Sequence, residues 1–75
     1  MKNRTINWVE GKIIQVLSKN PTIQTYLALS ANVLEDVRSI EEQHNLDIAV
    51  INLLSRKIIK RYKSDSGHTT YSLAA

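Results

Sequence analysis

The chain has 75 residues, of which 43% are hydrophobic, and a formal net charge of +3. This length indicates one small domain over residues 1–75, and the hydrophobic content is too high for a disordered chain. The absence of cysteine excludes a disulfide framework, a thiol nucleophile and a zinc site built on thiolates. Apolar runs are too short to span a bilayer and no secretory leader is visible, so we expect a cytoplasmic protein without membrane contact.

Two helices are predicted in the N-terminal part, on either side of Pro21. The first covers residues 8–19, with Asn7 as its N-cap and apolar residues at helical spacing. It should end before Pro21, because a residue that precedes proline disfavours helical dihedral angles. The second covers residues 21–30, since proline suits the first position of a helix.

The middle of the chain allows two interpretations. Asn32 can cap a helix over residues 33–45, with Glu35 three residues later. The segment from Ser39 to Glu42 also has the pattern of a capping box. Residues 33–46 are therefore one helix, or a short helix followed by a new one.

Asp47 is the predicted N-cap of a fourth helix, and the end of that helix is open. Helical spacing of apolar residues allows one helix over residues 48–62. Alternatively the helix ends near Lys57, and residues 58–63 form a strand, followed by a turn that ends at Gly67 and by an alternating segment. We prefer the hairpin. The expected fold is mainly α, a small domain of about four helices with a C-terminal β-hairpin.

The stretch LLSRKIIKRYKSDSGHTTYSLA, residues 53–74, resembles a winged helix-turn-helix DNA-binding domain. In that family a leucine near the end of the recognition helix precedes a short basic linker, a hydrophobic pair, a strand, a glycine-containing wing and a second strand. The corresponding residues here are Leu53, Ile58, Ile59, Gly67, Tyr71 and Leu73. Lys57 lies where the family usually has glycine. The resemblance implies a winged-helix-like fold and DNA binding in transcriptional regulation.

Five basic residues lie close together near the C-terminus with no acidic residue among them: Arg56, Lys57, Lys60, Arg61 and Lys63. Cations that neutralise DNA phosphates release condensed counterions, which favours binding. We therefore predict that these five residues share one exposed surface and contact the phosphates of double-stranded DNA. Asn52 and Ser55 are the candidates for contacts with base edges. We expect a homodimer, because symmetric half-sites double the contact that one small module makes.

A second hypothesis is a small all-helical regulator or inhibitor that binds another protein and no DNA. In that case residues 48–62 form one helix, and its excess of apolar residues serves the interface. An enzyme is not expected, because no serine has a nucleophile-elbow pattern and Gly11 and Gly67 cannot form a phosphate loop. No cofactor or metal is expected either, since Glu41 and His44 make only one of the paired motifs that a carboxylate-bridged metal site needs.

Overall fold

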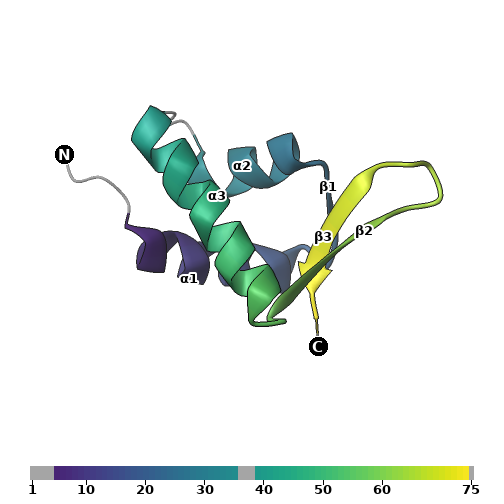
Figure 1. Cartoon of the computed structure of the whole chain (residues 1–75). Helices are drawn as coiled ribbons and strands as arrows, with labels where there is room; N and C mark the ends of the chain where they lie inside the picture. Colours follow the sequence, from purple (N-terminus) through teal and green to yellow (C-terminus); the bar gives the residue numbers. More distant parts are fainter. Residues whose placement is uncertain (1–4, 36–38, 75) are drawn as a thin grey trace.

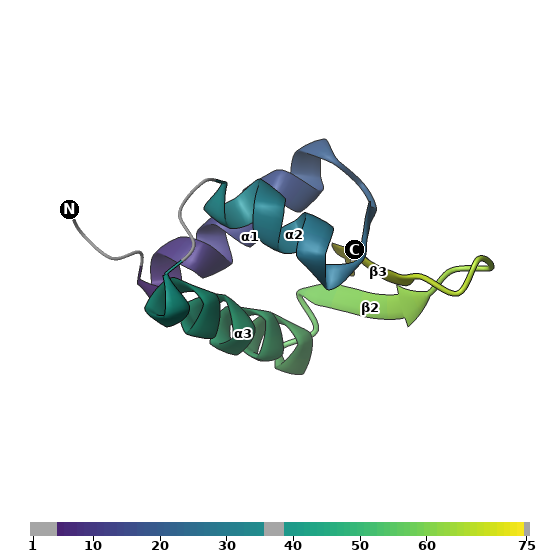
Figure 2. The ribbon, with the colours of Figure 1, turned by 90° about the horizontal axis from the view of Figure 1, so that it is seen from above.

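The computed structural model describes residues 5–35 and 39–74, which form three helices and a three-stranded antiparallel sheet. In chain order the elements are α1 (Ile6–Lys19), β1 (Ile23–Gln24), α2 (Tyr26–Leu34), α3 (Ile40–Ser55), β2 (Ile59–Lys63) and β3 (Thr69–Leu73). The helices pack together, and the β2–β3 hairpin extends away from them, with its turn at the far end (Figures 1 and 2). The mainly α fold with a C-terminal hairpin is confirmed, with three helices in the described residues where four were predicted.

The first helix, α1, begins two residues earlier than predicted. Thr5 is its N-cap, and the Trp8 N–H donates a hydrogen bond of 3.1 Å to the Thr5 hydroxyl. Asn7, the predicted cap, lies inside the first turn. The helix ends at Lys19 with Asn20 as its C-cap, in agreement with the expected stop before Pro21.

The prediction of a helix over residues 21–30 is wrong at its start. Ile23 and Gln24 form a strand instead, because they pair with Tyr71 and Thr70 of β3. The second helix then begins after Thr25, whose hydroxyl accepts a hydrogen bond of 3.1 Å from the Ala28 N–H. Sheet pairing with a distant strand therefore overrides the local preference of proline for a helix start.

The third helix, α3, begins at the second of the two predicted starts. Ser39 is its N-cap and accepts a hydrogen bond of 3.1 Å from the Glu42 N–H. The alternative start at Asn32 is wrong, because Asn32 lies inside α2 and donates to the Ala28 carbonyl at 2.8 Å. Residues 36–38 of the predicted helix lie outside the described residues. Asp47 does not begin a new helix, since α3 continues through it to Ser55.

A Schellman motif ends α3 and turns the chain into the hairpin. The Ile58 N–H donates to the Leu53 carbonyl at 2.9 Å, and the Lys57 N–H donates to the Leu54 carbonyl at 3.0 Å. Lys57 has a φ of 61°, the left-handed conformation that this motif requires. The hypothesis of one helix over residues 48–62 is therefore wrong, because the motif ends the helix before Ile59.

In the sheet, β3 lies between β1 and β2, so β2 is an edge strand. The register pairs Arg61 with Tyr71 and Lys63 with Thr69. Gly67 has a φ of 87° and closes the turn through a hydrogen bond of 2.8 Å to the Ser64 carbonyl. Among the residues that the structure describes, no helix is both long and apolar enough to cross a membrane.

The hydrophobic core brings all three helices together with the sheet. Its buried residues include Val9, Ile13, Leu17, Ile23, Leu29, Val33, Leu46, Leu53, Ile59 and Tyr71. Because Ile59 of β2 and Tyr71 of β3 belong to this core, the base of the hairpin is fixed to the helices, whereas the helices do not cover its turn (Figure 2).

Candidate nucleic-acid interface

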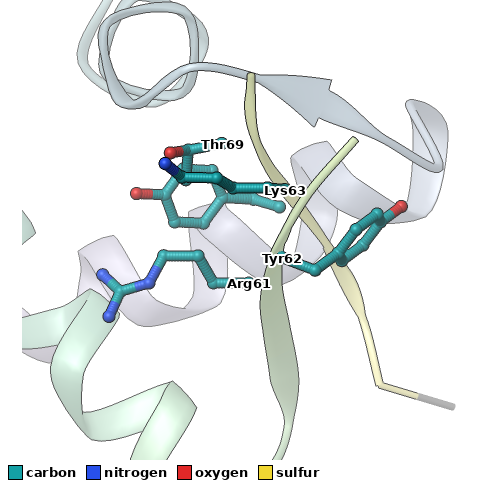
Figure 3. Close-up of a pocket in the computed structure, with 5 residues that line it drawn as sticks. Arg61, Tyr62, Lys63 and Thr69 are labelled. Carbon is teal, nitrogen blue, oxygen red and sulfur yellow. The ribbon is translucent and has the colours of Figure 1, made fainter. Parts of the chain in front are cut away.

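The edge strand β2 carries three exposed cations, Lys60, Arg61 and Lys63. Side chains alternate between the two faces of a strand, so Arg61 and Lys63 lie on one face and Lys60 lies on the other. Figure 3 shows Arg61 and Lys63 on one side of β2 and Tyr62 on the opposite side. Among residues 5–35 and 39–74, none of these three cations forms an ion pair with a carboxylate.

The face that carries Arg61 and Lys63 has a recess of about 320 Å³. Thr69 and Tyr71 of β3 also line it, and they are the register partners of Lys63 and Arg61. Tyr71 is only 3% exposed, so its ring forms part of the core as well as the wall of the recess. Tyr62 of β2 completes the lining. We call this site, lined by Arg61, Tyr62, Lys63, Thr69 and Tyr71, the hairpin recess.

Tyr26 of α2, which is half-buried, lies near Tyr71 of the hairpin recess. Its ring centroid lies 6.2 Å from that of Tyr71, with the two rings tilted by 55°. The Tyr26 hydroxyl donates a hydrogen bond to the Asp47 carboxylate and accepts one of 3.5 Å from the Gln43 amide. Burial, together with the hydrogen bond to Asp47, raises the pKa of Tyr26 well above its ordinary value of 10. Tyr26 therefore remains a neutral hydrogen-bond donor that links α2 to α3.

The opposite face of β2 holds Lys60 and Tyr62. The Lys60 ammonium lies 5.6 Å from the centroid of the Tyr62 ring, within the range of a cation–π interaction. Tyr62 is 41% exposed, so an aromatic surface lies beside this cation. The two faces of the hairpin thus offer cations in different surroundings.

Two of the predicted contact residues lie away from the hairpin. The Arg56 guanidinium donates to Glu10 at 2.7 Å, and the Asn52 amide donates to the same carboxylate at 3.1 Å. Both side chains therefore join α3 to α1. Ser55 and Lys57 are exposed at the end of α3, where the Schellman motif turns the chain.

The prediction that all five cations share one surface is therefore wrong. Strand alternation divides the cations of β2 between two faces, and Glu10 holds Arg56 at the junction of two helices. The sequence shows that the cations are neighbours along the chain, but it does not show their directions.

The exposed face of α3 is unsuited to reading base edges. It carries Ile40, Glu41, His44, Asp47 and Ile51, and α3 has no Arg or Lys. Base edges in the major groove are recognised mostly by Arg, Lys, Asn and Gln, and carboxylates are repelled by phosphates. The exposed fractions of Ile40 and Ile51 are 89% and 62%. This face would not attract DNA.

Sequence reasoning did not find Thr69 and Tyr71 as site residues. The sequence did contain a signal for them, because a hairpin with its turn at Gly67 places Thr69 and Tyr71 opposite Lys63 and Arg61.

Comparison of the chain with protein-family models, with curated proteins and with solved structures finds no match.

Proposed function

We propose that this protein binds double-stranded DNA through its phosphate backbone, with the β2–β3 hairpin as the contact element. The observation that carries the proposal is the edge strand with three exposed cations, Lys60, Arg61 and Lys63, none of which pairs with a carboxylate in the described part of the chain. Unpaired cations on a projecting element are available to phosphates, and the counterions released from the DNA drive association.

Cations on both faces of a ribbon suit a groove of duplex DNA. The major groove is about 12 Å wide and admits a two-stranded β-ribbon. A ribbon inserted there has a phosphate backbone on each side. Arg61 and Lys63 then face one backbone, and Lys60 faces the other. The division of the cations, which argues against a flat basic surface, is compatible with this arrangement.

The resemblance to a winged helix-turn-helix domain also supports the proposal. A helix, a short basic linker, a strand, a glycine-containing turn and a second strand follow one another over residues 53–74. The proposed binding differs from the family pattern in one respect, because the exposed face of α3 lacks base-reading side chains. We therefore propose binding with little sequence preference, and a role in transcriptional regulation stays a prediction.

The proposal is tested by fluorescence anisotropy with a duplex of about 20 base pairs, measured from about 50 to 200 mM salt. The logarithm of the binding constant should fall linearly with the logarithm of salt concentration. Replacing Lys60, Arg61 and Lys63 together with Gln should reduce that slope by up to about 2.7, since each phosphate contact contributes about 0.9. Circular dichroism shows whether this variant keeps its fold.

Lys19→Gln is the matched control, because it removes one exposed cation from the end of α1. The slope of the logarithm of its binding constant against the logarithm of salt concentration should equal that of the unmodified protein. A triple variant that is folded and keeps the original slope overturns the proposal.

Elution from a sizing column, with and without the duplex, checks the expected homodimer.

The exposed isoleucines of α3 favour a second candidate function, binding to another protein. Ile40 and Ile51 are apolar side chains on a helix face that the rest of the described chain leaves open. Absence of DNA binding at about 50 mM salt would overturn the DNA proposal and favour this function. The original form of the hypothesis, with one helix over residues 48–62, is excluded by the strand at Ile59.

A further inference from the structure

We infer that the hairpin recess is an oxyanion site that holds one phosphate group between Arg61 and Lys63. The inference rests on the proposed function for the source of that phosphate, a DNA backbone. It goes further in assigning Arg61 and Lys63 to a single phosphate and Lys60 to a different contact.

The geometry of the strand brings the two cations to one site. Side chains two residues apart on a strand point to the same face, with their Cα atoms about 6.8 Å apart. Both side chains are long and line the same recess. Arg61 offers a planar fork of N–H donors, Lys63 offers an ammonium group, and the Thr69 hydroxyl adds a neutral donor. Phosphate oxygens accept hydrogen bonds from guanidinium, ammonium and hydroxyl groups of this kind.

The surroundings of the recess favour an anion. Neither β2 nor β3 contains an acidic residue, and the carboxylate of Asp47 in α3 accepts the hydrogen bond of the Tyr26 hydroxyl. One wall is the buried Tyr71 side chain, whose ring centroid lies 6.2 Å from that of Tyr26, so this side of the recess is formed by a residue of the core. Electrostatic attraction is stronger beside such a wall than in open water. The volume of about 320 Å³ leaves room for a phosphate and the atoms attached to it.

Lys60 lacks these features. It does not line the hairpin recess, and its ammonium group lies 5.6 Å from the centroid of the Tyr62 ring. The two faces should therefore respond differently to a small anion, although they carry the same kind of charge. A difference between the two faces would distinguish a specific phosphate site from the general attraction of a basic hairpin for any anion.

The first test uses inorganic phosphate and the full chain, followed by nitrogen–proton NMR. We expect saturable shifts of the Arg61 side-chain signal and of the Thr69 and Tyr71 amides. Sodium chloride at the same ionic strength should not reproduce them. Arg61→Gln should weaken phosphate binding about tenfold, because it removes a charge-assisted pair of hydrogen bonds. Lys60→Gln is the matched control and should leave binding unchanged. Equal effects of the two variants, or the same shifts with chloride, overturn the inference.

The second test uses the DNA duplex and the salt slope. If Arg61 and Lys63 share one phosphate, the double variant Arg61→Gln/Lys63→Gln reduces the slope by about 0.9. A reduction of about 1.8 means two separate phosphates and overturns the inference, while the proposed function stands. If the hairpin recess binds inorganic phosphate but the protein binds no duplex, the oxyanion site stands and the proposed function fails.

Discussion

Lys57 occupies a position where the backbone conformation favours glycine, and its replacement should stabilise the protein. It is the residue after the C-cap of α3, with a φ of 61°. Hydrogen bonds from the N–H groups of Lys57 and Ile58 to the carbonyls of Leu54 and Leu53 hold this conformation. For a residue with a Cβ atom, the left-handed conformation brings Cβ close to the following carbonyl oxygen.

The size of the effect follows from two opposing contributions. The left-handed conformation costs an L-residue about 1–2 kcal/mol, which Lys57→Gly removes. Glycine loses about 0.5–1 kcal/mol more conformational entropy on folding. When the lower and the upper values of the two ranges are paired, the net gain in the free energy of unfolding is about 0.5–1 kcal/mol. For a domain of this size, that corresponds to a rise in Tm of about 2–8 °C.

The measurement is urea unfolding followed by circular dichroism, with Lys57→Ala as the control. Alanine removes the same charge as glycine but keeps the strained conformation, so the two variants differ only in the backbone contribution. We expect Lys57→Gly to be about 0.5–1 kcal/mol more stable than Lys57→Ala. Equal stability of the two variants would refute the argument from backbone strain.

Four other substitutions test separate features of the fold. Gly11→Ala should stabilise α1 by up to about 1 kcal/mol in urea unfolding, because an added Cβ at this position meets no heavy atom within 4 Å. Gly67→Ala, at a φ of 87°, should instead destabilise the hairpin. Glu10→Gln should lower stability by about 0.5–1 kcal/mol, less at high salt, since its partner Arg56 is 55% exposed. Tyr26→Phe should reduce the loss of stability above pH 10. The folded state of the unmodified protein keeps the Tyr26 proton that the unfolded state releases above pH 10, so its free energy of unfolding falls as pH rises in that range, as urea unfolding at several pH values would show.

Local signals in the sequence predicted several element boundaries correctly. The capping box at Ser39 marks the start of α3, and the glycine turn at Gly67 marks the hairpin. Both depend on residues within four positions of each other. Asp47 misled the prediction because a good capping residue also fits inside a helix when its carboxylate has another partner, here the Tyr26 hydroxyl.

Long-range pairing was not visible in the sequence. The strand at Ile23 and Gln24 has two residues, and nothing in its composition distinguishes it from a helix start. It exists because Tyr71 and Thr70 pair with it from the other end of the chain. The direction of each cation on β2 was not visible either, since it depends on where α3 ends and on which residue begins the strand.

The position of β2 at the edge of the sheet has a consequence for solubility. An edge strand presents unpaired backbone N–H and C=O groups, to which the same strand of another molecule can add. Lys60, Arg61 and Lys63 oppose such an addition, because two identical strands would bring like charges together. If the hairpin binds DNA as proposed, the polyanion would cancel that repulsion. Hairpins crowded along one duplex would then be free to join edge to edge, and DNA would promote assembly of the protein into larger particles.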